Sequence, residues 1–434
     1  MLKKFLGVCL AAALINLAAF AAVLPAQARD LRVALVEGQY NAEISCDDEF
    51  LVRDASGEEA VLPKGKYFLH VEDEKLVLGD YAFLNDITIL SLEGKKAPSV
   101  NRRSYKGSYH ASRQGDFLLV NNVLPLEAYL YSVLPAKTMP VWPDEVIKAQ
   151  AVAARSYTLH MMAQNVAEAY DLSANDKELK YEGTGKRVER LPISKLVHDT
   201  EGEYLADGSG MPACTVTTSS SGGRTEQGAY AYLPSLLDDD SDAPDFTWER
   251  RFASYLVQGL LEQRGYVIGT LQSIRLSPLK DEDETASPWG GDRTESTGRV
   301  KYLIFSGDAG TVQVSGEEFA ELLDLNSTLF DIDTGVPVPE TLKIPINNYW
   351  GAEIGHKDIP IKINKDDSPV WKDLRRSYHL VSGSKEEKLL IRGSGKGPGI
   401  GLSGWGARGM YNANDKLTYK DILAYYYPGT HLIK

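Results

Sequence analysis

The stretch that decides the fold is VLPLEAYLYSVLPAKTMPVWPDEVIKAQAVAARSYTL, residues 123–159. Its second half predicts a helix from Asp144 to about Ala163, since Pro143 suits a helix start and two acidic residues follow it. No Gly or Pro interrupts this run, and apolar residues recur along it at three- and four-residue spacing. The helix therefore has a buried face, and its many alanines allow neighbouring backbone to approach closely.

The residues before this helix predict strands, and the residues after it predict a mixture of helices and strands. Short runs rich in Val, Ile, Leu, Phe and Tyr, separated by turn signals, fill residues 30–122 and are typical of an antiparallel sheet or small sandwich. Behind the helix, residues 248–265 predict a second helix and residues 300–315 a hairpin. The fold class expected is α+β, with a strand-rich N-terminal part, a central alanine-rich helix and a mixed α/β C-terminal part.

The first 28 residues have the pattern of an export signal. Lys3 and Lys4 precede an uncharged run that ends in Ala26-Gln27-Ala28, a small-x-small site for signal peptidase. The uncharged run is also long enough to span a bilayer, so an uncleaved signal anchor is the competing interpretation. In both cases the body of the protein is expected outside the cytoplasmic membrane, in the cell envelope.

The net charge and the Cys and His content indicate which classes of ligand and which kinds of site are excluded. The 434 residues include 60 acidic and 47 basic side chains, a net charge of −13, so nucleic acid and anionic lipid are excluded as general partners. The histidines are scattered without metal-ligand spacing, and we expect no metal site and no cofactor. Cys46 and Cys214 are compatible with one disulfide or with two free thiols.

Four separated motifs carry the functional signal. The first is the stretch at residues 123–159; the others are SSSGGRTE (219–226), STGRV with VSGEEF and STLF (296–300, 314–319 and 327–330), and GSGKGPGIGLSGWGARGM (393–410). Each alone is weak, because glycine-rich turns and alanine-rich helices are common. Their occurrence together, in this order, is specific.

Together the motifs resemble the family of stage II sporulation protein D and the amidase enhancer LytB (SpoIID/LytB). The segment RSYKGSYH at residues 103–110 resembles the entry strand of that family. The resemblance implies a cell-wall protein that acts on peptidoglycan glycan strands. In some members this means a lytic transglycosylase, and in others an accessory protein that enhances an N-acetylmuramoyl-L-alanine amidase.

The resemblance also suggests a domain organisation. We expect a signal peptide at residues 1–28 and a β-rich N-terminal domain at 30–122. A SpoIID/LytB core at 123–333 is followed by an insertion at 334–388, and the Gly-rich loop and terminal helix at 389–434 complete the core.

A lytic transglycosylase needs one carboxylic acid that protonates the glycosidic oxygen and then takes a proton from the sugar's own C6 hydroxyl. In the family this acid is a Glu in a Pro-x-Glu-Met-Pro turn before the alanine-rich helix. The matching stretch here is PAKTMP, residues 135–140. Counted without a gap the Glu position holds Lys137, and matched on Met-Pro it holds Thr138. Neither is a carboxylic acid.

Other positions of the family pattern are partly kept. Pro398 and Gly404 stand where the family has His and Gln, and Leu179 where it has a further Gln. The residues that the resemblance assigns to substrate binding are Gln150, Arg155, Ser221, Gly222, Gly223, Ser403 and Trp405. Gln150 and Arg155 could instead satisfy buried backbone groups, and the two glycines could serve only a tight turn.

Two function classes follow. The first is a glycan-binding or amidase-enhancing protein in which the catalytic Glu has been replaced. The second is an active transglycosylase that uses another acid, such as Glu127 or Glu145. In either case the loop at residues 393–409 is expected beside the start of the central helix, because distant small-residue motifs make sense if they converge on one ligand.

The signal sequence yields a direct prediction. The mature protein should begin at Arg29, because the Ala-Gln-Ala site is followed at once by charge. Mass spectrometry of the protein recovered from the native envelope measures this, and an intact end at Met1 in the membrane fraction would establish the anchor instead.

Overall fold

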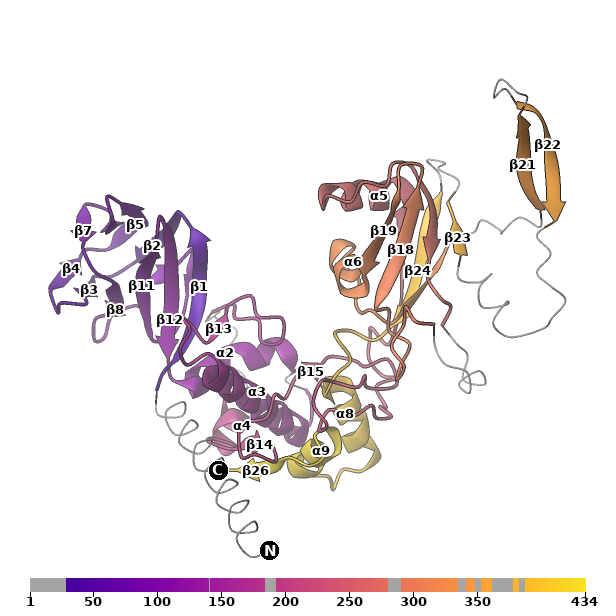
Figure 1. The fold of residues 1–434 in the computed structure, drawn as a ribbon. Coiled ribbons are helices and arrows are strands. Elements are labelled where there is room, and N and C mark those ends of the chain that lie inside the picture. Colours follow the sequence, from indigo (N-terminus) through magenta and orange to yellow (C-terminus); the bar gives the residue numbers. More distant parts are fainter. Residues whose placement is uncertain are drawn as a thin grey trace, which may run out of the picture. The chain divides into compact units, whose positions relative to one another are not determined.

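The computed structural model describes residues 29–139, 141–183, 193–279, 290–334, 341–347, 353–360, 378–381 and 387–434 (Figure 1). The chain forms two compact units. Unit 1 comprises Met1–Thr217, Ala229–Pro234 and Ala407–Lys434, and unit 2 comprises Thr218–Gly228 and Ser235–Gly406. The predicted signal peptide and most of the predicted insertion at 334–388 lie outside the described residues. The α+β class is confirmed, and the domain boundaries stay a prediction.

Unit 1 begins with two sheets. Their strands are β1 Leu31–Gln39, β2 Asn41–Cys46, β3 Phe50–Asp54, β4 Glu59–Leu62, β5 Gly65–Glu72, β6 Lys75–Leu78, β7 Tyr81–Phe83, β8 Ile87–Ser91, β9 Ser99–Val100, β10 Arg103–Ser104, β11 Ser108–Gln114, β12 Phe117–Leu124 and β13 Leu172–Ser173. The seven-stranded sheet has the order β13-β1-β12-β11-β8-β3-β4, and the six-stranded sheet the order β10-β9-β2-β5-β6-β7.

The two sheets pack face to face through alternating side chains. In β2, Ala42, Ile44 and Cys46 are buried while the residues between them are not, as period-two alternation requires. Strand β12 of the larger sheet contacts β2 and β5 of the smaller one. The strand prediction for residues 30–122 is thereby confirmed.

The helical part of unit 1 is built around one helix. Helix α3, Asp144–Gln164, starts after Pro143 as predicted and is buried over most of its length. It contacts α2 Leu126–Lys137, α4 Ile193–Asp199, α9 Tyr419–Tyr426 and the strand β14 Tyr204–Ala206. Strand β14 pairs with β26, His431–Ile433, so the end of the chain is attached beside this helix.

A buried carboxylate links the first strand to the segment that follows α3. The Asp171 side chain is fully buried, and it accepts hydrogen bonds from Arg29 Nη1 and Nη2 at 2.7 and 2.6 Å. It also accepts from Arg32 Nη2 at 2.8 Å and from the Arg32 backbone at 2.9 Å. Burial alone would raise the pKa of Asp171, but the hydrogen bonds from the two arginines outweigh it and lower the pKa.

The core of unit 2 lies among a three-stranded sheet, a four-stranded sheet and the helices α5 and α6. The first sheet has the order β16-β24-β20 and the second the order β19-β18-β17-β23. The elements are β16 Thr247–Ala253, α5 Ser254–Gln263, β17 Leu271–Arg275, β18 Tyr302–Gly307, β19 Thr311–Ser315, α6 Gly316–Leu322, β20 Phe330–Asp333, β23 Tyr378–Leu380 and β24 Lys388–Ser394.

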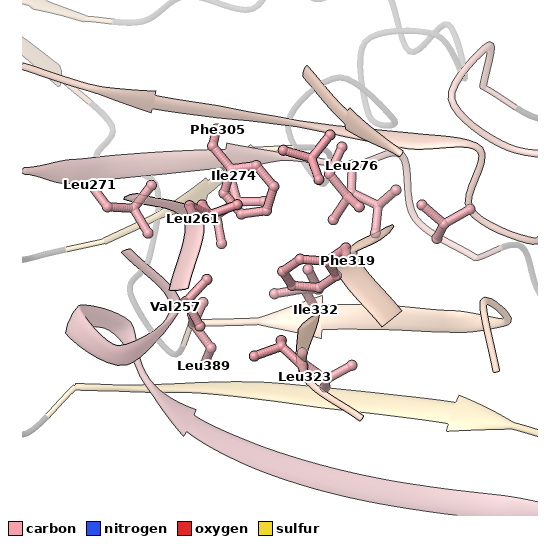
Figure 2. Close-up of a cluster of buried hydrophobic side chains, with 14 of the residues drawn as sticks. Val257, Leu261, Leu271, Ile274, Leu276, Phe305, Phe319, Leu323, Ile332 and Leu389 are labelled. Atoms are coloured by element: carbon pink, nitrogen blue, oxygen red, sulfur yellow. The ribbon is translucent and has the colours of Figure 1, made fainter. Parts of the chain in front are cut away.

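The core of unit 2 centres on Phe319 of α6, which lies between Phe305 of β18 and Ile332 of β20 (Figure 2). The Phe305 and Phe319 ring centroids are 5.4 Å apart, and the Phe319 and Phe330 centroids 5.9 Å apart. The hairpin predicted over residues 300–315 is confirmed by the pairing of β18 with β19.

Four further groups of elements complete the described part of the chain. They are β15 Thr217–Thr218, the paired strands β21 Thr341–Asn347 and β22 Glu353–Pro360, β25 Leu402–Ser403, and α8 Gly404–Ala413. In the part of the chain that the structure describes, no helix has the length and apolar character needed to cross a membrane.

The helix predicted over residues 248–265 is wrong in its first half. Residues 247–253 form the strand β16, which pairs along its whole length with β24, and α5 starts only at Ser254. Trp248 packs in the core cluster of unit 2 with Phe252 beside it. The four-residue spacing of these two side chains fits a helix and a strand equally well, and only pairing with a distant segment selected the strand.

Asp171→Asn should lower the free energy of unfolding by about 2–3 kcal/mol at pH 7, because two cations lose their shared buried anion. The native-state pKa of Asp171 is depressed, so this stabilisation is present above the ordinary Asp pKa of about 3.9 and is lost as the pH falls through the lower native value. Urea unfolding of both proteins as a function of pH measures the difference.

The matched control is Glu59→Gln, which breaks the exposed pair of Glu59 with Arg53. It should change the stability by less than about 1 kcal/mol. An Asp171→Asn variant as stable as the Glu59→Gln variant would contradict the anchoring role.

Candidate functional site

The turn between α2 and α3 separates the two residues that could stand at the family's Glu position. Helix α2 ends at Lys137 because Thr138 adopts an extended backbone, with φ −126° and ψ 156°. The Thr138 hydroxyl donates to the Leu134 carbonyl at 2.9 Å, and Thr138 is buried. Thr138 therefore faces its own helix, while Lys137 extends away from it.

Lys137 ends in a compact polar group that we call the Lys137 cluster, formed by Lys137, Glu178 and Thr217. The Lys137 ammonium makes an ion pair with Glu178 Oε1 and donates to Thr217 Oγ1 at 2.6 Å. Thr217 donates to the same oxygen from its backbone N–H at 2.9 Å and from its hydroxyl at 2.5 Å. The side chains of Lys137 and Glu178 are 22% and 9% exposed, so the pair is partly open to solvent.

Glu178 is held in place by a turn built on Asp176. Asp176 Oδ1 accepts the backbone N–H groups of Glu178 and Leu179 at 2.9 and 2.8 Å, the arrangement of an Asx turn. Tyr157 of α3 donates its hydroxyl to the other Asp176 oxygen at 3.1 Å. The central helix thereby fixes the loop that carries the carboxylate.

Burial and the two carboxylates raise the pKa values of the groups around the cluster. Burial, followed by the charges of Asp176 and Glu178, raises the pKa of the Tyr157 hydroxyl. Burial, followed by the charges of Glu178 and Asp176, raises the pKa of the Cys214 thiol to about 11. Cys214 and Cys46 are free thiols, which settles the alternative that the sequence left open.

Both acids that the sequence offered as substitutes are bound to cations elsewhere in unit 1. Glu127 makes two hydrogen bonds to Arg155, from Nε at 2.7 Å and from Nη2 at 2.9 Å. Glu145 pairs with Lys148 at 2.8 Å and accepts the Tyr419 backbone N–H at 2.8 Å. Each carboxylate links secondary-structure elements, which is a structural use.

Two of the predicted substrate residues lie inside the helical part of unit 1. Arg155 is 1% exposed and also donates to the carbonyls of Glu203 and Val197, at 2.9 and 3.2 Å. Gln150, on the same helix, is buried. These contacts match the alternative in which Arg155 satisfies buried backbone groups.

The SSSGG turn of unit 2 surrounds a buried carboxylate. Asp240 accepts the backbone N–H groups of Gly222 and Gly223 at 2.9 and 2.8 Å, and the Ser220 hydroxyl at 2.5 Å. Ser221 donates its hydroxyl to Asp238 at 2.5 Å. Both glycines have positive φ, 82° and 101°. The amides of this turn are therefore occupied by a residue of the chain itself.

The Gly-rich loop supplies the last two predicted residues. Ser403 is fully buried and its hydroxyl accepts the Gly406 N–H at 3.1 Å. Trp405 is half-buried, and its backbone N–H donates to the Ser219 carbonyl at 3.1 Å. Ser403 belongs to unit 2 and Lys137 to unit 1. The convergence of the loop with the start of the central helix stays a prediction, as do the substrate roles of all these residues.

Sequence reasoning missed Glu178. It stands directly before Leu179, the position where the resemblance already marks a departure, but a lone Glu in the run NDKELKYEG carries no motif of its own. Only the fold brings it against Lys137, which is distant in the chain.

Comparisons with known proteins identify the same family that the sequence motifs resemble. The family model of the Stage II sporulation protein (SpoIID) matches residues 114–206, which include α2, α3 and the Lys137–Glu178 pair. An amidase enhancer of Bacillus subtilis is 24% identical over 70% of this chain and 40% of its own length. The stage II sporulation protein D of the same organism is 24% identical over 71% of this chain and 74% of its own.

An uncharacterised protein of Brachyspira hyodysenteriae is also 24% identical, over 77% of this chain and 74% of its own. The resemblance to the SpoIID/LytB family is thereby confirmed.

The thiol of Cys214 reports on the charge of Glu178. Alkylation by iodoacetamide should follow a pKa of about 11 in the natural sequence. It should follow a lower pKa in Glu178→Gln, because removal of a nearby negative charge favours the thiolate. Peptide mass spectrometry of the alkylated protein, in a Cys46→Ser background, gives the profile. Glu262→Gln, on α5, is the control and should leave it unchanged, whereas an unchanged profile in Glu178→Gln would remove Glu178 from the neighbourhood of Cys214.

Proposed function

We propose that this protein is an exported cell-wall protein of SpoIID/LytB type that binds peptidoglycan glycan strands without cleaving them. The family match and the relatives named amidase enhancer and stage II sporulation protein D support a function connected with the cell wall. A protein that holds glycan without cutting it suits a role beside a hydrolase, and an N-acetylmuramoyl-L-alanine amidase is the partner that the relative's name indicates.

The observation that carries the proposal is the ion pair at the family's acid position. A transglycosylase must present a protonated carboxyl group to the glycosidic oxygen. Neither Lys137 nor Thr138, the two residues that can be matched to this position, is a carboxylic acid, and the Lys137 ammonium is bound to a carboxylate and a hydroxyl of the same unit. Loss of such an acid–base group typically lowers the rate by about 10²–10⁴-fold.

One specific observation favours the second candidate, a transglycosylase that uses another acid. Glu178 is a carboxylate in the Lys137 cluster, partly exposed and held by a rigid turn. Of the acids considered, it is the one that contacts Lys137, the residue that the gapless match of the turn puts at the family's Glu position. Glu127 and Glu145, by contrast, serve as structural links to Arg155 and Lys148.

Incubation of the mature protein with denuded sacculi separates the two candidates. We expect the protein to sediment with the sacculi and to release no anhydro-muramyl products detectable by mass spectrometry. Release of such products, abolished in Glu178→Gln with binding retained, would establish cleavage by Glu178 and overturn the proposal.

A second experiment introduces a carboxylic acid at position 137 and asks whether cleavage appears. Lys137→Glu places a second carboxyl group against Glu178, and two carboxyl groups at that distance raise the pKa of one of them, so that a proton is held near neutral pH. We expect cleavage to appear in Lys137→Glu, at about 10²-fold or more above the background of the natural sequence.

Two matched variants control this gain. Lys137→Glu combined with Glu178→Gln keeps a carboxyl group at position 137 without its charged neighbour and should cleave more slowly. Thr138→Glu buries a charge behind α2 and should unfold at lower temperature without gaining activity. Cleavage by Thr138→Glu but not by Lys137→Glu would show that the alternative match of the turn is correct.

A further inference from the structure

A shallow pocket of about 490 Å³ lies in the N-terminal β part, and none of its lining residues belongs to the four sequence motifs. It is lined by Tyr40, Asn41, Phe68, His70, Val71 and Asp116. Ligand pockets typically have volumes of about 300–1,000 Å³ and combine apolar walls with a few polar groups. This pocket has both properties.

The aromatic side chains of the pocket are unusually exposed. Tyr40 is 66% exposed and Phe68 59% exposed. In β5, Phe68 and His70 alternate with buried Leu69, so both project from the outer face of the six-stranded sheet. A single exposed aromatic residue needs no explanation, but neighbouring ones lining a depression indicate a binding surface.

The preference of aromatic residues for strands does not explain why Tyr40 is exposed at this position. Tyr40 is the one residue that joins β1 to β2, so it lies outside both strands. Its ring is packed against Phe117, with centroids 4.8 Å apart. Phe117 thereby limits the motion of the Tyr40 ring, which lowers the entropy cost of placing a ligand on it.

Polar side chains that can hydrogen-bond to a sugar line the pocket together with the rings. Asn41 lies opposite His70 in the pairing of β2 with β5, and Asp116 precedes the Phe117 ring that supports Tyr40. Amide, imidazole and carboxylate groups suit the hydroxyl and acetamido groups of a sugar, whose C–H faces suit aromatic rings.

We propose that this pocket is a second glycan-binding site, which holds N-acetylated hexose units of a peptidoglycan strand on Tyr40 and Phe68. The ligand class rests on the proposed function, whereas the location rests on the pocket itself. A second site on the same chain would raise the overall affinity for a long strand through multivalency.

The test uses the full mature protein and soluble β-1,4-linked N-acetylglucosamine oligosaccharides, with binding measured by calorimetry and, for strands, by sedimentation with denuded sacculi. Tyr40→Ala and Phe68→Ala should each lower the affinity of this site by about three- to tenfold. Tyr40→Phe should restore most of it. Tyr255→Ala, at an equally exposed tyrosine of α5 in unit 2, is the matched control and should have no effect.

The outcomes separate this inference from the proposed function. Sedimentation with sacculi that persists unchanged in Tyr40→Ala and Phe68→Ala, together with unchanged oligosaccharide affinity, overturns the second site and leaves the proposed function standing. Absence of binding in the natural sequence overturns both. A dimer seen by analytical ultracentrifugation that dissociates in Tyr40→Ala would show that the rings hold a second copy of the chain, and would also overturn the inference.

Discussion

The close packing around α3 is the constraint on which unit 1 depends. Helix α3 is buried over most of its length and contacts α2, α4, α9 and β14, elements drawn from distant parts of the chain. The small side chains of its alanines allow the backbones of these elements to lie close to the helix. Its one buried cation, Arg155, is matched by the carboxylate of Glu127 and by two backbone carbonyls. A buried guanidinium without these acceptors would be strongly destabilising, so the position of this helix is over-determined.

The same helix positions the Lys137 cluster without contributing a reacting group. The Tyr157 hydroxyl donates a hydrogen bond to Asp176, and Asp176 accepts the backbone N–H of Glu178. Glu178 in turn makes the ion pair with Lys137. This chain of hydrogen bonds fixes a carboxylate against the end of α2. In this cluster the cation is on α2 and the carboxylate is on the loop that faces it. An inherited binding scaffold can persist after replacement of a catalytic Glu, since sugar recognition rests on stacking and neutral hydrogen bonds.

The SSSGG turn of unit 2 has the conformation that its glycines predict, but this conformation does not reveal what its backbone amides bind. Its glycines have the positive φ that a tight turn requires, and its amides converge on one point as an anion-binding turn would. The point is occupied by Asp240, a residue from the acidic loop that follows. The sequence shows both segments but not their contact, because the contact depends on a chain reversal.

The sequence by itself determined the helix from Asp144, the strands of the N-terminal part and the hairpin near residue 300, because periodicity, caps and turn residues are local properties. It also determined that no carboxylic acid stands at position 137 or 138. The strand β16 was assigned as a helix from sequence because its apolar spacing fits both periods, and its partner β24 lies far along the chain.

Tertiary structure alone decided that Thr138 turns inward, that Glu178 meets Lys137, and that Glu127 and Glu145 are structural. The contacts of Glu178 with Lys137, of Glu127 with Arg155 and of Glu145 with the Tyr419 backbone join residues on different elements, and a local pattern carries no information about such contacts. The inward turn of Thr138 is a local contact with Leu134, but the sequence does not show which of the residues after α2 makes it.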